Sequence, residues 1–424
     1  MYRWANDLFP ICRSITGKGA EETLRYIQTI LPEMEIRKVP TGTKAFDWIV
    51  PQEWEINDAY IADERGDRIV DFKKLNLHVM GYSTAVDETL SFEELDSHLY
   101  SLKDLPNAVA YVTSYYERRW GFCIAHSQRE ELRKEPHKKY RVKIDSRHFD
   151  GHLTYGECVL KGESEKEILL STYICHPSMA NNELSGPVVA AALGRYLKEA
   201  PRRYTYRIVF APETIGSIVY LSANLKTMKE RTIAGFVLTC IGDDRCYSYL
   251  SSRYGNTLAD KIAIHTLKYI APNFKRYSFL DRGSDERQYC SAGVDLPVCL
   301  IMRSKFGEYP EYHTSLDNMG LISPAGLEGG FNAVKSCLDI AEANYVYTNT
   351  VLCEPQMSKR NLYPTMSAKG SADKVRTLMN FLAYADGTND LIDIAEILGV
   401  YAGDLIEIAN ILTKARLVTR NDDL

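Results

Sequence analysis

The stretch that decides the fold reads Ile168-Leu-Leu-Ser-Thr-Tyr-Ile-Cys175-His176-Pro-Ser-Met-Ala-Asn-Asn182-Glu183-Leu-Ser-Gly186. Its apolar and β-prone start predicts a buried strand over Ile168–Ile174. A histidine, two amides and a carboxylate follow, and a helix is predicted from Pro187 to Glu199. Such a loop offers ligands at a rigid strand end. A capped strand-to-helix turn is the simpler interpretation of this segment alone.

The same alternation of strands and helices continues downstream, which predicts a doubly wound α/β fold with a mixed sheet flanked by helices. In such sheets, binding residues gather beyond the carboxyl ends of the strands. The further predicted strands are Tyr206–Phe210, Gly235–Cys240 and Val298–Met302, and the further helices are Ile215–Leu225, Leu258–Tyr269 and Pro324–Asn344.

Three other regions differ in texture from this α/β part. Residues 2–31 show helical spacing, broken by the turn Thr16–Gly19, and residues from Phe46 to about Tyr155 read as mostly β. Three short helices with the start of a strand suggest a C-terminal winged helix-turn-helix. The expected domains are therefore 1–45 with 155–350 (α/β), 46–154 (an inserted β-rich domain), 351–370 (a linker) and 371–424 (the winged helix). The expected C-terminal helices are Ala372–Ala385, Leu391–Leu398 and Ala402–Ala415.

Composition excludes several classes of protein. The chain has 424 residues, 45% of them hydrophobic and 25% charged, with a formal net charge of −5. These values are typical of a globular protein and argue against one that coats nucleic acid. Because no apolar window is long enough to cross a membrane and the first residues do not resemble a signal peptide, we expect a cytoplasmic location and no membrane partner. The ten cysteines include no C-x-x-C pair, so neither a thiolate zinc cluster nor a disulfide framework is expected.

Several chemically active residues follow the predicted strands and helix starts. Glu213 comes after the second strand, where it is either a general base, a metal ligand or an acid at a helix N-terminus. Asp285 and Glu286 open a helix, and His313 follows the last strand. Together with His176 these side chains are expected to converge on one rim of the sheet. Two imidazoles and carboxylates around an open position are the donors used by catalytic zinc.

The order of motifs resembles a family of bacterial aminopeptidase-like proteins of unknown function. Its members are often labelled polysaccharide-biosynthesis proteins with an aminopeptidase-like domain, and its core is similar to co-catalytic zinc aminopeptidases with an inserted β domain. The resemblance covers essentially the whole chain. The matching motifs are His176, Asn-x-x-x-Ser-Gly ending at Gly186, Pro-Glu-Thr-Ile-Gly-Ser from Pro212, Gly-Ser-Asp-Glu from Gly283, Tyr-His-Thr from Tyr312, and Arg13–Gly17.

The resemblance implies metal ligands at His176 and His313 and a general base at Glu213. Three further ligand positions of the zinc aminopeptidases carry neutral residues here: Asn182 replaces a bridging aspartate, Thr214 a glutamate and Thr239 an aspartate. Neutral oxygens are poor substitutes for carboxylates around two adjacent dications. We therefore expect one zinc ion, with His176, His313 and Asn182 as the candidate metal-binding residues. The carboxylate ligand is left open between Glu213, Glu183 and Asp285.

Further residues are candidates for catalysis or substrate binding. Asp285 either fixes a histidine tautomer or binds a substrate amine. Arg13 either contacts a substrate carboxylate or phosphate or forms a surface ion pair. The remaining candidates for substrate binding are Glu183, Glu286 and Tyr312. The aromatic run Tyr115, Tyr116 and Trp120 is either a sugar-stacking wall or, as aromatic residues at strand spacing more often are, part of a core or interface.

The leading functional hypothesis is a mononuclear zinc hydrolase that cleaves an amide bond in a small or peptide-like substrate, with Glu213 as the proton acceptor. The neutral residues at the ligand positions also allow a catalytically inactive binding or scaffold protein. The family label hints at a third reading, acyl transfer or a modified-sugar amide. Residues 371–424 carry five basic and nine acidic side chains, so phosphate attraction is weak. The winged helix is therefore expected to contact a protein partner or a second copy of the chain rather than nucleic acid.

Overall fold

The computed structural model describes residues 1–362 and 371–422. The chain forms two compact units, Met1–Ala259 with Lys275–Phe331, and Asp260–Phe274 with Asn332–Leu424. Within the described residues, no helix combines the length and the apolar character that crossing a membrane requires. The expected linker 351–370 lies partly outside the described residues.

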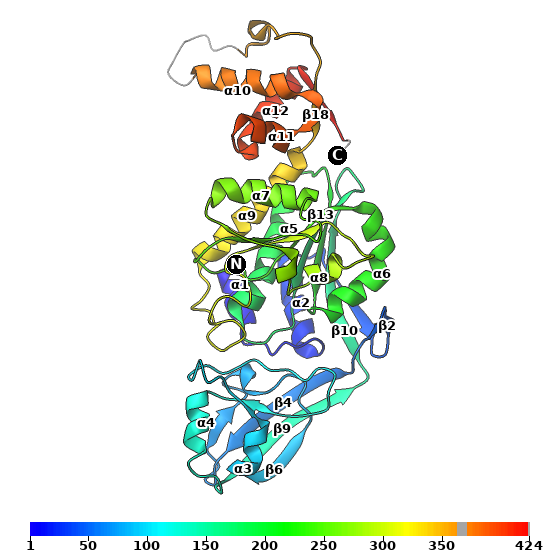
Figure 1. Cartoon of the computed structure of the whole chain (residues 1–424). Coiled ribbons are helices and arrows are strands. Elements are labelled where there is room, and N and C mark those ends of the chain that lie inside the picture. Colours follow the sequence, from blue (N-terminus) through cyan, green and yellow to red (C-terminus); the bar gives the residue numbers. More distant parts are fainter. Residues whose placement is uncertain (363–370, 423–424) are drawn as a thin grey trace. The chain divides into compact units, whose positions relative to one another are not determined.

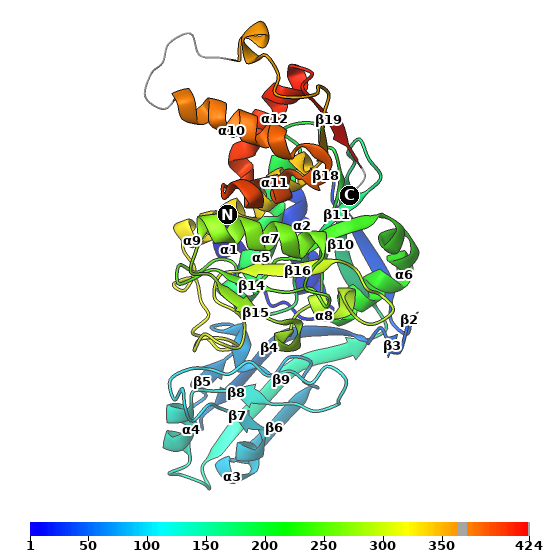
Figure 2. The ribbon, with the colours of Figure 1, turned by 45° about the horizontal axis from the view of Figure 1, so that its top comes forward.

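The centre of the first unit is an eight-stranded mixed sheet (Figures 1 and 2). β11 pairs in parallel with β12 and β13, and antiparallel pairs lie toward both edges. Every residue of β11, β12 and β16 is buried, as expected for strands covered on both faces. This confirms the predicted fold class. In sheet order the strands are β1 (Glu35–Pro40), β10 (His152–Leu160), β12 (Thr205–Ala211), β11 (Glu167–Tyr173), β13 (Thr232–Val237), β16 (Val298–Met302), β14 (Ser248–Leu250) and β15 (Lys275–Tyr277).

Helices cover both faces because successive strand residues point to opposite sides. On one face, Leu169 and Val209 pack in a core with Ile218 of α6 (Ile215–Arg231), and α6 contacts α8 (Glu286–Tyr289). On the other face, α5 (Ser185–Leu197) packs with α1 (Tyr2–Leu8) and α2 (Lys18–Ile30) (Figure 1). Gly186 allows α5 to approach the sheet, since a Cβ there would lie 2.3 Å from the Leu238 carbonyl oxygen.

The N-terminal region departs from the predicted helix over residues 2–31. α1 ends at Leu8 and α2 begins at Lys18, so the break is longer than the expected turn and includes Ile11. Arg13 explains the difference, because its buried Nη1 donates to the Leu8 carbonyl oxygen at 2.7 Å and satisfies the end of α1.

The inserted region forms an antiparallel sheet of four strands with its own apolar core. Two short strand pairs and two helices accompany it. The elements are β2 (Lys44–Ala45), β3 (Trp48–Ile49), β4 (Glu53–Ala62), β5 (Arg68–Asp71), β6 (Val86–Ser91), α3 (Phe92–Leu95), β7 (Leu99–Tyr100), β8 (Phe122–Cys123), α4 (His126–Leu132) and β9 (Lys139–Phe149).

The second unit contains the winged helix, with three helices and a three-stranded sheet ordered β18-β17-β19. β17 precedes the expected linker and lies within the range 155–350 that the sequence predicts for the α/β domain. It instead pairs with β18 and β19, because its backbone groups complete their ladder. The elements are α7 (Leu258–Ile270) and α9 (Pro324–Ala343), both shared with the first unit, β17 (Val346–Asn349), α10 (Ser371–Tyr384), β18 (Asp386–Asp390), α11 (Leu391–Leu398), α12 (Ala402–Lys414) and β19 (Val418–Asn421).

Candidate metal centre

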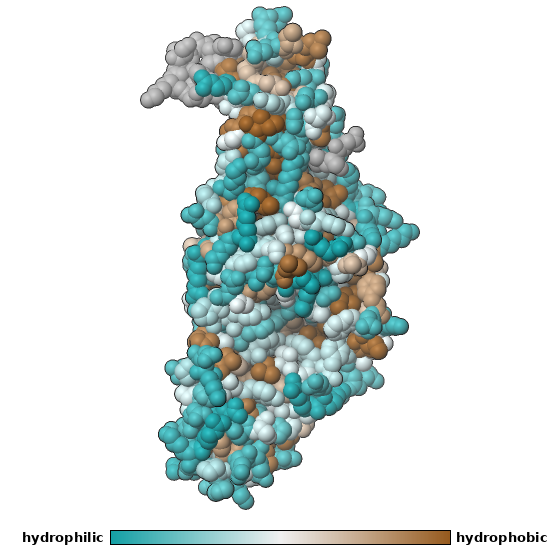
Figure 3. Space-filling model, viewed as in Figure 1, coloured by the Kyte–Doolittle hydropathy of each residue, from teal (hydrophilic) through white to brown (hydrophobic). Residues whose placement is uncertain are grey.

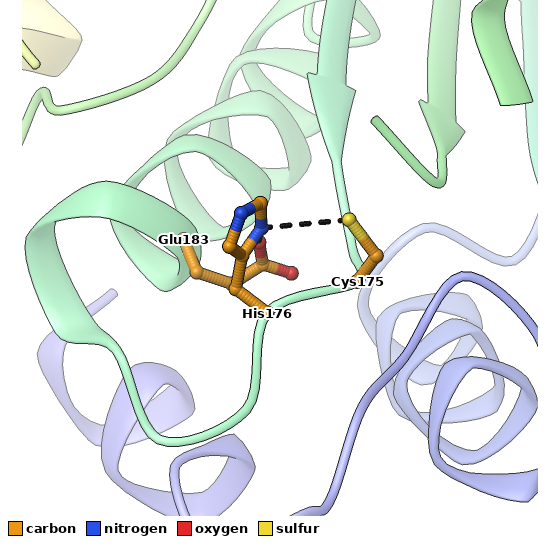
Figure 4. Close-up of side chains that lie close together, drawn as sticks. All are labelled: Cys175, His176 and Glu183. Carbon is orange, nitrogen blue, oxygen red and sulfur yellow. Dashed lines mark hydrogen bonds and ion pairs between the residues drawn. The ribbon is translucent and has the colours of Figure 1, made fainter. Parts of the chain in front are cut away.

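His176 lies in the loop that follows β11, and both of its ring nitrogens face acidic groups. Nδ1 lies 2.9 Å from Glu183 Oε2 and 3.4 Å from the Cys175 sulfur (Figure 4). Nε2 lies 3.7 Å from Glu213 Oε2. When Glu183 is ionised it accepts a hydrogen bond from Nδ1–H, which leaves a lone pair on Nε2. The His176 ring is therefore oriented so that the unprotonated Nε2, which could bind a metal ion, lies on the side of Glu213.

Arg13 and Glu183 lie behind His176. Arg13 Nε donates to the His176 carbonyl oxygen at 3.0 Å and lies 3.5 Å from Glu183 Oε1. Both side chains are 0% exposed, so neither Arg13 nor Glu183 can make the substrate contact expected from the sequence. Burial raises the pKa of Glu183, and the Arg13 guanidinium opposes this shift. The structure favours a positioning role for both residues.

Glu213 sits on a strained turn between β12 and α6. Thr214, the next residue, has φ of 65°, a conformation that a β-branched residue rarely adopts. Asp285 Oδ1 holds this turn by accepting from the Thr214 backbone at 2.8 Å and from Ser217 Oγ at 2.9 Å. Burial and the neighbouring Asp285 raise the pKa of Glu213. Asp285 is 0% exposed and burial raises its pKa to about 6, and its hydrogen bonds go to the turn that follows Glu213.

The other two candidates for substrate binding lie in different surroundings. Glu286 is 0% exposed, and its Oε1 accepts from the backbone of Gly283 and Ser284 at 2.8 and 3.2 Å. Glu286 therefore fixes the start of its own helix, and it too is too deeply buried to contact a substrate. Tyr312 is only partly buried and stacks on His313, with ring centroids 3.9 Å apart.

His313 is brought to His176 and is held by the inserted region. The two imidazole centroids are 5.3 Å apart, and burial lowers the pKa of each ring to about 3. His313 has φ of 54°, and its carbonyl oxygen accepts from the Tyr111 backbone at 3.0 Å. The Tyr111 ring centroid lies 5.1 Å from both imidazoles. Both rings are thus neutral at physiological pH and present nitrogen lone pairs.

The three neutral residues at expected ligand positions are bonded into the protein. Asn182 Nδ2 donates to the Tyr173 hydroxyl at 2.8 Å, and Thr239 Oγ1 lies 2.6 Å from the same hydroxyl. Thr214 Oγ1 accepts from Arg287. Asn182 Oδ1 is buried and has no hydrogen-bond partner within the described part of the chain. Among the side-chain oxygens of Asn182, Thr214 and Thr239, Asn182 Oδ1 is therefore the one left free to bind a metal ion.

Two sets of donors could hold a metal ion. His176 Nε2, His313 and the Glu213 carboxylate form one set, which has the composition of catalytic zinc sites; His176 Nε2 lies 3.7 Å from Glu213 and the two imidazole centroids are 5.3 Å apart, but the three donor atoms are not all within 4.8 Å of one another. Cys175, His176 Nδ1 and Glu183 form the other, with their donor atoms within 4.8 Å of one another (Figure 4). The second set is unfavourable, because Arg13 places a cation beside Glu183 and burial raises the pKa of the Cys175 thiol.

Sequence reasoning missed two residues that shape the centre. Asp317 accepts backbone N–H groups from Ala180, Asn181 and Asn182 at 3.1, 2.6 and 2.9 Å, and so fixes the loop that carries Asn182. Its only signal in the sequence is its place four residues after His313. Tyr111 is the other, and no local pattern distinguishes it from neighbouring aromatic residues.

Comparison with known proteins confirms the resemblance and the fold. The family described as Domain of unknown function (DUF4910) matches residues 2–344, and a winged helix-turn-helix family matches residues 345–420. A Clostridium acetobutylicum protein, described as a candidate polysaccharide biosynthesis protein with an aminopeptidase-like domain, is 41% identical over 398 residues. This alignment covers 93% of the chain and 90% of that protein.

Solved structures show the same architecture. The crystal structure of a candidate peptidase from Clostridium acetobutylicum has a TM-score of 0.92 at 38% identity, covering 99% of this chain and 95% of that one. BSAP, a zinc aminopeptidase from Bacillus subtilis, has a TM-score of 0.57 at 11% identity, covering 80% of this chain and 94% of that one. The fold is therefore aminopeptidase-like. The chain belongs to the DUF4910 family, here joined to a C-terminal winged helix.

Proposed function

We propose that this protein is a mononuclear zinc hydrolase that cleaves an amide bond in a small or peptide-like substrate. The observation that carries the proposal is the convergence of two neutral imidazoles with one partly exposed carboxylate. His176 Nε2 lies 3.7 Å from Glu213, and the His313 ring lies 5.3 Å from the His176 ring. This is a donor set that suits zinc with an open position. The zinc aminopeptidase fold of BSAP agrees with this choice of metal.

The fit favours one ion over two. The side-chain oxygens of Thr214 and Thr239 are occupied by hydrogen bonds, and the Arg287 guanidinium bonded to Thr214 adds a positive charge where a second dication would need a carboxylate. His176 and His313 would hold the ion, with the orphaned Asn182 Oδ1 as a further neutral ligand, which leaves the Glu213 carboxylate beside them free to act as the proton acceptor.

Bound zinc supplies a Lewis acid that polarises the amide carbonyl and lowers the pKa of water. Glu213 has the exposure needed for proton transfer, with 21% of its side chain accessible. Burial and Asp285 raise the pKa of Glu213, and a cation beside it would lower that pKa again, so that the carboxylate would accept a proton from water and then deliver it to the leaving nitrogen. Asp285 holds the Glu213 turn, while Glu183 and Arg13 hold His176, so the proton acceptor and the imidazole keep their relative position.

Amide hydrolysis by zinc-loaded protein tests the proposal. We would assay a panel of aminoacyl anilides, short peptides and N-acyl sugars with wild type, with Glu213→Gln and with the exposed control Glu230→Gln. Turnover of at least one substrate is expected, with a loss of about 10²–10⁴-fold in Glu213→Gln and none in the control. Turnover that survives in Glu213→Gln would refute the assigned role of Glu213.

A second candidate is a binding or scaffold protein that has lost catalysis. Asn182, Thr214 and Thr239 favour it, because each replaces a carboxylate that the zinc aminopeptidases would use. On this reading Glu213→Gln leaves every cellular readout of the protein unchanged. A clear loss of cellular function in that variant would exclude it.

A further inference from the structure

Exposed aromatic and aliphatic side chains gather where the β2–β3 hairpin lies against Tyr116. Ile49 is 57% exposed and Tyr116 is 55% exposed, and Phe46 and Trp48 are exposed beside them. Trp48 and Tyr116 meet edge to face with ring centroids 5.7 Å apart. Hydrophobic atoms lie at the edge of Figure 3 where Figure 1 labels β2. Exposed apolar clusters of this kind mark binding surfaces.

A pocket of about 160 Å³ opens next to this aromatic cluster. Its lining combines aromatic rings with planar polar groups, namely an amide, a guanidinium, a carboxylate and an imidazole. The lining residues are Pro51, Gln52, Tyr82, Tyr115, Tyr116, Glu117, Arg118 and His148. A few polar groups set among aromatic rings are typical of pockets for small molecules.

The inner wall of the pocket is rigid. Tyr82 stacks on Trp54 with centroids 5.6 Å apart and meets Tyr115 edge to face at 5.4 Å. The Tyr82 hydroxyl bonds to Thr16 and to the Gln52 carbonyl oxygen. Tyr82 has φ of 67°, a strained conformation that this surrounding packing maintains. A preformed wall lowers the entropic cost of binding.

The polar part of the pocket is close to charge balance. Arg118 donates to Gln52 Oε1 and forms no ion pair with the described residues, and Glu117 pairs with Arg119. Burial and Arg118 lower the pKa of His148, so this ring is neutral. Such a lining offers hydrogen bonds in several directions without demanding a charged ligand.

We propose that this pocket binds a sugar ring. A sugar presents apolar C–H groups, which suit the Tyr116 ring in the lining and the Trp48 ring that neighbours it outside the lining, and hydroxyls, which suit Arg118, Glu117 and His148. The cavity volume of about 160 Å³ is small, which suits one ring and not a folded peptide segment. The many hydrogen-bonding groups in the lining disfavour a purely apolar occupant.

The pocket connects to the candidate metal centre through two tyrosines. The Tyr115 ring packs on Tyr82, and the Tyr115 hydroxyl lies 2.8 Å from the Tyr111 hydroxyl. The Tyr111 ring in turn contacts both His176 and His313. The inference rests on the proposed function in one respect: if the pocket holds the sugar part of the substrate, the amide that is hydrolysed is attached to that sugar. Sugar binding itself requires no zinc and no turnover.

Ligand-observed saturation-transfer NMR on the full-length, metal-free protein tests the pocket separately from catalysis. The probes are glucose and N-acetylglucosamine, and the variants are Tyr116→Ala, Arg118→Ala and the control Tyr254→Ala. Tyr254 is also a tyrosine exposed on the first unit, at 62%, and lies outside the pocket lining. We expect saturation of at least one probe by wild type and by Tyr254→Ala, with affinity about tenfold weaker in Tyr116→Ala and in Arg118→Ala.

Three other outcomes of this experiment would overturn the proposal that the pocket binds a sugar. Absence of saturation for both probes with folded wild type removes the sugar site, whether or not amides are hydrolysed. Equal binding by wild type and both pocket variants places the sugar elsewhere. If sedimentation shows a dimer that Tyr116→Ala dissociates, and no sugar binds, the aromatic cluster is an interface between two copies. Failure of the amide assay alone leaves the binding result intact.

Discussion

Glu183 determines which nitrogen of His176 is free to bind a ligand. Its Oε2 lies 2.9 Å from Nδ1, while Nε2 points toward Glu213. Only the ionised form of Glu183 accepts from Nδ1–H, and burial raises its pKa to about 8; replacement by Gln keeps the shape and removes this ionised form, which stabilises the Nδ1–H tautomer. We expect Glu183→Gln to weaken zinc binding about 10–100-fold in a chelator-competition titration. The exposed Glu165→Gln serves as the control, and an unchanged zinc affinity in Glu183→Gln would contradict the positioning role.

At this scale, sequence reasoning located the convergence of side chains better than their roles. His176, Glu213 and His313 each follow a strand, and strand ends meet at one rim of a parallel sheet, so their proximity was predictable. The burial of Arg13, Glu183 and Glu286 was not, because side-chain depth depends on packing between segments far apart in the chain. Tyr111 is 202 residues away from His313 in the sequence. It reaches the histidines because Ala110 forms a β-bridge with Thr314 and the Tyr111 backbone donates to the His313 carbonyl oxygen.

At the scale of elements, Arg207 joins two adjacent strands in the interior of the sheet. From β12 its guanidinium donates to both Glu167 oxygens on β11 at 2.6 and 2.8 Å, and Glu167 is 1% exposed. Arg207→Ala would leave this carboxylate buried without its partner. We expect a loss of about 3–5 kcal/mol in the free energy of unfolding, measured with urea.

The matched control for this prediction is a surface ion pair. Arg231 and Glu165 are paired at 3.1 Å, but their side chains are 39% and 82% exposed. Arg231→Ala is expected to cost at most about 1 kcal/mol. Similar losses in Arg207→Ala and Arg231→Ala would show that burial does not govern the strength of these pairs.

His265 makes the contacts between α7, α11 and α12 sensitive to pH. Its Nδ1 lies 2.6 Å from Glu396, and its Nε2 accepts from the Ala402 backbone at 2.9 Å. Burial lowers the pKa of His265, although Glu396 opposes the shift. In the unfolded chain His265 has a pKa of about 6.5, so below that pH the unfolded chain binds a proton at His265. The folded chain binds this proton only at a lower pH. The stability contributed by this site is therefore full above about pH 6.5 and declines below it.

Thermal unfolding at a series of pH values checks this prediction. We expect the melting temperature of wild type to fall more steeply below about pH 6.5 than that of His265→Gln, which has no titrating ring at this position. Parallel pH profiles for the two proteins would show that His265 does not contribute to the pH dependence of stability.

The regular elements were largely predictable because local pattern and burial agree. Residues Val298–Met302 form β16 as expected, and Leu391–Leu398 form α11 between the Asp390 capping box and Gly399, whose φ is 66°. α6 continues past its predicted end at Leu225 to Arg231, where Met228 is fully buried. Such extensions depend on tertiary packing, which overrides local propensity.

At the scale of the whole molecule, the winged helix raises the question of what it binds. Family comparison supports its presence at residues 345–420, yet α12 carries Asp404 and Glu407 ahead of Lys414. We propose that this unit contacts protein. Fluorescence anisotropy with labelled duplex DNA is expected to show no tight binding at low salt. Nanomolar binding that weakens steeply with added salt would contradict this proposal.

The central claim, a single zinc ion held by His176 and His313, is tested most directly by the metal content of the protein purified without chelator. The account predicts about one zinc per wild-type chain and none in a folded His176→Ala, His313→Ala double variant. No zinc in wild-type protein, even after zinc is offered, would contradict it, as would equal zinc in the double variant.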